Sequence, residues 1–225
     1  MKITAVIPVR KGSQRVPEKS FRPFANSNLL KLKIEKLKQA ACFDDIVVNT
    51  DSEKAIKIAK KSGVNYHRRE PFYASSQCSA SDFFHHIGNS TQTDVFAYTP
   101  VTVPFIKSKT YQKCVENFKT DNGHDSFATV TLMKHHMWLN GEPLNYELDK
   151  QPNSQNLPNI YAINWGLCLI HKEDLLQYKN VIGKNPEFVQ LSSIEGIDID
   201  TPLDFFIAEQ VYIRTVIEKN KLVKF

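Results

Sequence analysis

The residues best suited to chemistry lie near the two ends of the chain. Close to its start, an apolar run at residues 3–8 leads into a basic segment that contains Arg10, Lys11, Gly12, Ser13, Arg15 and Lys19. Backbone N–H groups near a glycine and a serine can approach phosphate oxygens closely, and cationic side chains neutralise their charge. The segment therefore favours a polyphosphate ligand, with a merely solvated basic loop as the alternative.

Two acidic residues near the other end have a complementary pattern. Asp198 and Asp200 flank one apolar residue, Ile199, so in an extended segment both carboxylates would point the same way. Two such oxygen ligands suit Mg²⁺, which completes its shell with water and phosphate. The alternative is that both acids only favour the N-terminus of a helix that Thr201 and Pro202 would start. Together with the basic segment, they predict a metal–triphosphate site.

Strand and helix patterns alternate along the chain and must position these residues. We expect strands at 3–8, 46–50, 64–67, 94–99, 126–133 and 161–170. We expect helices at 29–41, 53–62, 82–88, 108–119, 172–178 and 202–219. This alternation predicts an α/β fold: a Rossmann-like, mixed and mostly parallel sheet with helices on both faces. Ligands bind such sheets at the carboxyl ends of strands, where the basic segment would lie.

Residues 134–158 interrupt the alternation. They carry Gly141 and several prolines but few periodic apolar positions, which predicts an insertion or an extended arm. The pair Asn140-Gly141 is typical of a tight hairpin turn. At 225 residues, the chain suits a single domain, 1–225, with this arm as an appendage.

Composition narrows the classes of function. The net charge is +5, and the cations are spread over several expected helices, which argues against a nucleic-acid binder. Pro8 and Arg10 cut the first apolar run short, and no run reaches membrane-spanning length, so we expect no membrane partner. The four cysteines are far apart and form no zinc-binding pattern, which together with the missing leader predicts a cytoplasmic protein.

Four segments resemble motifs of the acylneuraminate cytidylyltransferase family, in the family's order. Residues 7–20 are similar to IPARGGSKGIPxKN, and residues 49–64 to STDDEEIAxxAxxxGA. Residues 155–165 resemble QDLPxxYxxNGxxY, and residues 198–209 match DIDTPxDxxxAE closely. The resemblance implies the nucleotide-diphospho-sugar transferase type of fold. It also implies transfer of CMP from CTP to the anomeric hydroxyl of a sialic-acid-like sugar acid, with release of pyrophosphate.

The resemblance further implies Mg²⁺ as cofactor and a homodimer in which the arm at 134–158 reaches toward the partner's site. Carried over position by position, it assigns catalysis to Arg10, Lys19, Asp198 and Asp200, the two aspartates holding the metal. Nucleotide binding falls to Arg10, Lys11, Gly12, Ser13, Lys19, Asp51, Arg69 and Ser79, with Arg68 as the alternative to Arg69. Acceptor binding falls to Thr99, Thr102, Gln155, Tyr161 and Asn164.

The chain departs from the family pattern at four places, one of which is Ser20 in place of the asparagine after the motif lysine. Lys11 stands at the second glycine of the opening motif, and Trp165 stands at the glycine of the NG pair. The family's LQPTSPLR segment is represented by residues 98–106, without a clear counterpart of its glutamine or arginine. This last change leaves the identity of the acceptor open.

Three other functions compete with this interpretation. A metal-dependent glycosyltransferase also uses D-x-D, but it would need a long acceptor domain after Asp200, where only a helix and a tail follow. A nucleotide-binding relative without catalytic activity would fit the altered residues 98–106. A cytidylyltransferase acting on a different acidic acceptor would fit the same change.

Overall fold

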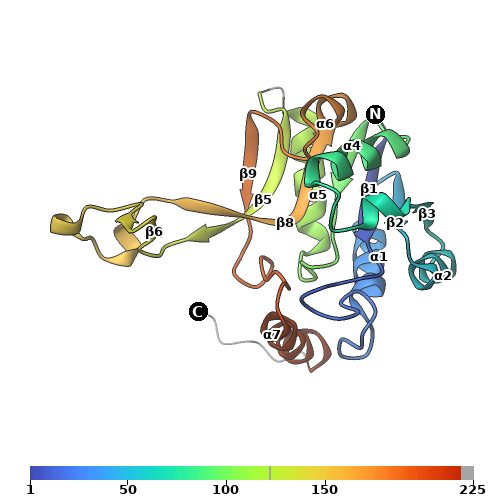
Figure 1. Ribbon diagram of the computed structural model, residues 1–225, viewed down its shortest axis with the longest axis horizontal. Helices are drawn as coiled ribbons and strands as arrows, with labels where there is room; N and C mark the ends of the chain where they lie inside the picture. Colours follow the sequence, from blue (N-terminus) through green and yellow to red (C-terminus); the bar gives the residue numbers. More distant parts are fainter. Residues whose placement is uncertain (122, 219–225) are drawn as a thin grey trace.

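A computed structural model of the chain describes residues 1–121 and 123–218 (Figure 1). At its centre is a seven-stranded sheet in the order β3-β2-β1-β4-β8-β5-β9. Its strands are β1 Ile3–Val9, β2 Asp45–Thr50, β3 Asn65–Arg68, β4 Val95–Tyr98, β5 Ser126–Met133, β8 Ile160–His171 and β9 Pro186–Gln190. Strand β8 is antiparallel to both of its neighbours, and the other pairs are parallel. The predicted mixed, mostly parallel sheet is confirmed.

Helices cover both faces of this sheet. They are α1 Leu29–Ala40, α2 Glu53–Lys61, α3 Pro71–Ala74, α4 Ala80–Ser90, α5 Ser108–Thr120, α6 Lys172–Tyr178 and α7 Pro202–Tyr212. In β1, alternate side chains pack on opposite faces: Ile3, Ala5 and Ile7 join a core with α1, α5 and α7. Val6 joins a second core with Phe84 of α4 and with α6. The two cores account for the near-continuous apolar runs of the central strands.

The structure differs from the sequence-based expectation at three elements. Strand β9 and the short helix α3 were not predicted. The sequence gives little sign of β9, an edge strand that begins at Pro186 and leaves Phe188 exposed. The last helix, expected at 202–219, is α-helical only to Tyr212 and continues as a π-helix over Ile213–Ile217. Its expected end, Lys219, lies outside the described residues.

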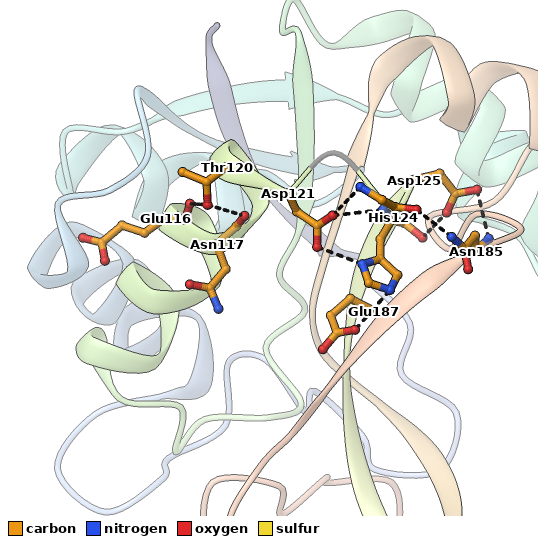
Figure 2. Close-up of polar contacts among 10 residues, drawn as sticks. Glu116, Asn117, Thr120, Asp121, His124, Asp125, Asn185 and Glu187 are labelled. Atoms are coloured by element: carbon orange, nitrogen blue, oxygen red, sulfur yellow. Dashed lines mark hydrogen bonds and ion pairs between the residues drawn. The ribbon is translucent and has the colours of Figure 1, made fainter.

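Strand β9 is attached through a polar cluster around His124 (Figure 2). The His124 Nδ1 atom lies 2.8 Å from Asp121 Oδ2, and its Nε2 atom lies 3.3 Å from Glu187 Oε2 of β9. Beside it, Asp125 Oδ2 accepts the backbone N–H of Lys184 at 2.7 Å. A carboxylate at each ring nitrogen favours the cationic imidazole, and the hydrogen bond that His124 donates to Asp121 raises the His124 pKa.

The strand order places a switch point between β1 and β4. From β1 the chain builds outward through β2 to β3, and it then crosses back to add β4 on the other side of β1. The connections after β1 and β4 therefore leave in opposite directions. A crevice at such a point, outside the carboxyl ends of the strands, is where open α/β sheets bind ligands. The basic segment follows β1 directly.

An arm projects from the body between β5 and β8, drawn in yellow in Figure 1. It carries a small hairpin of β6 (Trp138–Leu139) and β7 (Glu142–Pro143). Two 3₁₀ turns follow, η1 (Leu148–Lys150) and η2 (Ser154–Asn156). Asn140 and Gly141 both have positive φ, 52° and 88°, as a two-residue hairpin turn requires. The hairpin predicted at this pair is confirmed.

In the middle of β8, the pairing with β5 is irregular. The register shifts between Ala128 and Val130, and Trp165 on β8 has φ of 60°. This is the left-handed region that favours glycine. The indole lies 6.5 Å from the Phe84 ring and 6.4 Å from the Tyr98 ring, between centroids. The backbone at Trp165 is therefore strained, and the indole packs among aromatic rings.

Candidate active site

A pocket of about 510 Å³ lies at the switch point. One wall comes from the basic segment after β1, and another from the segment after β4. The rest comes from Arg69 after β3, from α3 and the start of α4, and from Asp200. The position agrees with the ligand crevice that the topology predicts.

The two ends of the chain meet in this pocket. Arg15 Nη2 lies 2.9 Å from Asp200 Oδ1, and Lys19 Nζ lies 3.6 Å from the same oxygen. The Lys19 ammonium also donates to the backbone carbonyl of Ile199. The basic segment therefore meets Asp200 as predicted, whereas Asp198 does not line the pocket.

A tight turn aims Lys19 at the acidic pair. The Lys19 backbone N–H donates to the Val16 carbonyl at 3.1 Å, and the intervening Glu18 has φ of 53°. Val16 is fully buried and anchors the turn in the core. The ammonium is itself largely buried, and this burial lowers the Lys19 pKa, while the charges of Asp200 and Asp198 oppose the shift.

Hydrogen bonds to the segment after β4 hold the acidic segment in place. Ile199 is fully buried, and its N–H donates to the Thr102 carbonyl at 2.9 Å. Upstream, the buried Glu195 carboxylate accepts from the Lys107 N–H at 3.0 Å and from Thr110 Oγ1 at 2.6 Å. Glu195 thereby supplies the cap that Lys107, as the residue before α5, lacks. These bonds place the two aspartates on a firm backbone.

Asp198 has the properties of a cation ligand. Its Oδ1 atom is buried and has no hydrogen-bond partner among the described residues. Burial raises the pKa of this carboxyl, a hydrogen bond from Thr102 lowers it, and the charge of Asp200 raises it further. A buried, unpartnered oxygen beside a second carboxylate is a donor set that fits Mg²⁺. In the described part of the chain, no three His, Cys, Asp or Glu residues gather to hold a metal, so water and phosphate would complete the shell.

Of the two adjacent arginines, the structure places Arg69 at the pocket. Arg69 is 5% exposed, and its guanidinium lies 4.5 Å from the centre of the Phe83 ring. It donates from Nε to Asn49 Oδ1 at 2.6 Å and from Nη2 to the Asn49 carbonyl at 2.8 Å. Burial lowers the Arg69 pKa to about 10. Arg68 instead lies at the surface and pairs with Glu53.

The residues expected to bind nucleotide divide into two sets. Those that line the pocket are Arg10, Ser13, Lys19, Arg69 and Ser79. Lys11, Gly12 and Asp51 do not line it; the Lys11 N–H donates to Asp51 Oδ1 at 2.8 Å, which ties the basic segment to the end of β2. Ser79 also caps α4, because its Oγ accepts the Asp82 N–H at 3.0 Å.

Of the residues expected to bind the acceptor, only Thr102 lines the pocket. Thr99 is buried and donates to the Val6 carbonyl at 3.0 Å. Asn164 is buried at the irregular pairing, where its Oδ1 accepts from Thr129 Oγ1 at 2.7 Å. Gln155 lies in η2 of the arm, and Tyr161 lies at the base of the arm. Within one chain, these last two are thus separate from the pocket.

Several pocket residues were missed from the sequence. Arg15 and Gln14 are part of the basic segment, and the density of cations there was the signal that could have found Arg15. Tyr73, Phe83 and Pro100 form further parts of the wall. No motif or period marks these three, because α3 and α4 reach the pocket only through the tertiary fold.

A cationic pocket at the switch point of a mixed sheet defines a nucleotide-binding α/β protein. A family model described as cytidylyltransferase matches residues 4–204. The chain therefore belongs to the cytidylyltransferase family, as the motifs predicted.

Curated relatives agree with this assignment. CMP-N,N'-diacetyllegionaminic acid synthase of Legionella pneumophila is 30% identical, over 94% of this chain and 96% of that protein. Post-translational flagellin modification protein B of Campylobacter coli is 25% identical, over 92% and 93%. N-acylneuraminate cytidylyltransferase of Escherichia coli is 26% identical over 92% of this chain, which spans only 51% of that longer protein.

Solved structures share the fold at lower identity. CMP:2-keto-3-deoxy-manno-octonic acid synthetase complexed with CTP aligns with a TM-score of 0.70 and 14% identity, over 96% of this chain and 100% of that one. 4-Diphosphocytidyl-2C-methyl-D-erythritol synthase of Anaerococcus prevotii aligns with a TM-score of 0.71 and 13% identity, over 95% and 96%. The predicted fold type is confirmed.

Proposed function

We propose that this chain transfers CMP from CTP to the anomeric hydroxyl of a sialic-acid-like, nonulosonic sugar acid and releases pyrophosphate. The observation that carries the proposal is the contact of Arg15 and Lys19 with Asp200 inside the pocket. Support comes also from the relatives, whose names include a CMP-diacetyllegionaminic acid synthase and N-acylneuraminate cytidylyltransferases.

The basic segment would hold the triphosphate. The acceptor hydroxyl loses its proton to solvent and its oxygen forms a bond to the α-phosphorus. The bond from that phosphorus to the oxygen bridging to the β-phosphate breaks, and pyrophosphate leaves. In such a reaction the protein mainly positions the groups and neutralises charge. Arg10 would bind the oxygens of the transferred phosphate, while Ser13 and Lys19 would bind the departing pyrophosphate. Arg69 and Ser79, which also line the pocket, would contact the rest of the nucleotide.

Asp198 and Asp200 would hold Mg²⁺. When bound, this ion supplies positive charge that stabilises the negative charge of the phosphates in the transition state. Arg15 and Lys19 keep the Asp200 carboxylate at the pocket wall through their 2.9 and 3.6 Å contacts. Thr102 hydrogen-bonds to the Asp198 carboxyl and orients it.

We place the acceptor's remaining contacts on a second copy of the chain. Gln155 lies in the arm and Tyr161 lies in β8 at its base, and the arm points away from the body that carries its own pocket (Figure 1). The arm exposes the large apolar side chains Trp138, Leu139, Leu144 and Leu148. A homodimer would cover this surface and bring the arm to the partner's pocket. Changing Leu139 and Leu148 to serine should give monomers in light scattering, whereas dimers of unchanged affinity would refute this arrangement.

The cytoplasm is the compartment we propose. All four cysteines, which lie in the described ranges, are free thiols, as is common in a reducing compartment. Among the described residues, no helix combines the length and the apolarity needed to cross a membrane.

A panel assay tests the proposed reaction. The purified chain is supplied with CTP, Mg²⁺ and one of several 2-keto-3-deoxy sugar acids, and pyrophosphate is measured. We expect release with at least one nonulosonic acid and none without acceptor. CTP binding in calorimetry without turnover on any acid would instead support a non-catalytic relative. Release only with a different acidic acceptor would keep the chemistry and change the substrate.

A further inference from the structure

Asn49, on β2, links the pocket arginine to a histidine that does not line the pocket. Its Oδ1 accepts from Arg69 Nε at 2.6 Å, and its Nδ2 lies 2.8 Å from His67 Nδ1. A guanidinium can only donate hydrogen bonds, so the amide oxygen must face Arg69. The amide NH₂ group then faces His67, and this requires His67 Nδ1 to accept.

We propose that His67 is a positioning residue for Arg69, which it holds at the pocket wall through Asn49 only while Nδ1 carries no proton. The consequence for nucleotide binding rests on the function proposed above. A proton on Nδ1 would place two donors against each other. If Asn49 then turned its amide over, its NH₂ group would face Arg69 Nε and move the conflict to that side. A proton on His67 Nδ1 therefore breaks one of two hydrogen bonds of Asn49, either the one with His67 or the one with Arg69.

The surroundings of His67 keep this proton away near neutral pH. Arg69 and Glu70 face the ring from the segment after β3, and His86 faces it from α4, with ring centroids 5.8 Å apart. Burial lowers the His67 pKa first, Arg69 lowers it further, and Glu70 opposes them. His86, stacked on Tyr73 at 3.6 Å, also has a lowered pKa. The link is therefore intact at neutral pH and fails on acidification.

Nitrogen NMR of the imidazole tests the link without any ligand. In the free protein at about pH 8, we expect His67 as the tautomer with its hydrogen on Nε2 and a bare Nδ1. A tautomer with the hydrogen on Nδ1 would overturn the proposal. So would an imidazolium form at this pH.

CTP affinity tests the consequence. His67→Gln offers an acceptor oxygen at all pH values, whereas His67→Lys offers only donors. At about pH 8, we expect the glutamine variant to bind CTP like the unsubstituted chain and the lysine variant to bind about tenfold more weakly. Toward about pH 5.5, the unsubstituted chain should lose affinity relative to His67→Gln. Protonation of CTP itself affects both proteins equally and cancels in this ratio.

His85→Gln is the matched control, because His85 is half-buried on α4 and hydrogen-bonds only to Asn89 among the described residues. It should follow the unsubstituted chain at every pH. Parallel loss of affinity in the unsubstituted chain and His67→Gln would overturn the proposal. Failure of the unsubstituted chain to bind CTP at any pH would instead refute the proposed function, and the tautomer would still decide the role of His67.

Discussion

Arg15 and Asp200 are 185 positions apart in the chain, yet a guanidinium nitrogen and a carboxylate oxygen lie 2.9 Å apart. The two side chains are 65% and 42% exposed. An ion pair this exposed contributes little to stability, because water and salt screen it. Its significance is positional: it holds one end of the chain against the other across the mouth of the pocket.

Asp200→Asn should leave the fold intact and reduce CTP-dependent pyrophosphate release by at least about a hundredfold, because it removes the charge that would hold the cation. The proposed reaction is the readout, and circular dichroism verifies folding. Glu35→Gln, the same loss of charge on the exposed face of α1, is the control and should keep full activity. Unimpaired turnover by Asp200→Asn would defeat the metal assignment.

Arg10 and Lys11 are adjacent cations that the structure separates by position. Arg10 lines the pocket, whereas the exposed Lys11 does not, and it bonds to Asp51 only through its backbone N–H. Arg10→Ala should lower kcat/KM by about one to two orders of magnitude, as expected for the loss of a charge-assisted hydrogen bond in the transition state. Lys11→Ala should change it by less than about threefold. Equal losses would mean that both side chains reach the nucleotide.

Trp165 offers a test of backbone strain. With φ of 60°, this position should tolerate glycine better than alanine. Both Trp165→Gly and Trp165→Ala lose the indole's contacts with Phe84 and Tyr98, so both should be less stable than the unsubstituted chain. The glycine variant should be the more stable of the two by about 1 kcal/mol in urea unfolding. An alanine variant of equal or higher stability would contradict the strain.

The His124 cluster predicts how stability depends on pH (Figure 2). The hydrogen bond that His124 donates to Asp121 raises the His124 pKa, so the folded state binds this proton more tightly than the unfolded state. The stabilisation by protonated His124 is therefore complete below the ordinary histidine pKa, and it is lost as pH rises through the raised pKa of the folded state. The Asp121 pKa is lowered, first by His124, so its contribution is lost in acid as pH falls through that value.

His124→Gln should abolish the alkaline part of this dependence. Urea unfolding between about pH 5.5 and 8 measures it: the unsubstituted chain should lose stability over this range relative to the variant. If the free energies of unfolding of the two proteins depend on pH in the same way, the imidazolium does not connect β9 to the loop after α5.

Much of the fold could be predicted because its central strands are buried on both faces. Ile3, Ala5, Val6 and Ile7 form an apolar run with no exposed position, which is typical of such a strand. The edge strand β9 lacks this pattern, since Phe188 and other side chains there face solvent. The register shift beside Trp165 arises from the pairing of β5 with β8, a tertiary relationship that no local pattern encodes.

The residues of the candidate site could likewise be predicted from the sequence only in part. Asp200 and Lys19 could be found because their chemistry and spacing are unusual within the segments that carry them. Asn49 and His67 could not, because neither touches the pocket and their importance depends on where Arg69 points. Arg68 and Arg69 are adjacent in the sequence. No local pattern shows that the Arg69 side chain is buried while the Arg68 side chain lies at the surface.

The arm leaves the sheet from β5 and returns on β8, its antiparallel neighbour. Because both ends of the arm enter one paired ladder, residues can be gained or lost at its tip without changing the order of the strands. The nucleotide pocket, built on β1 and β4, is insulated from such changes. Evolution can therefore lengthen, shorten or recompose the arm while the pocket is inherited unchanged.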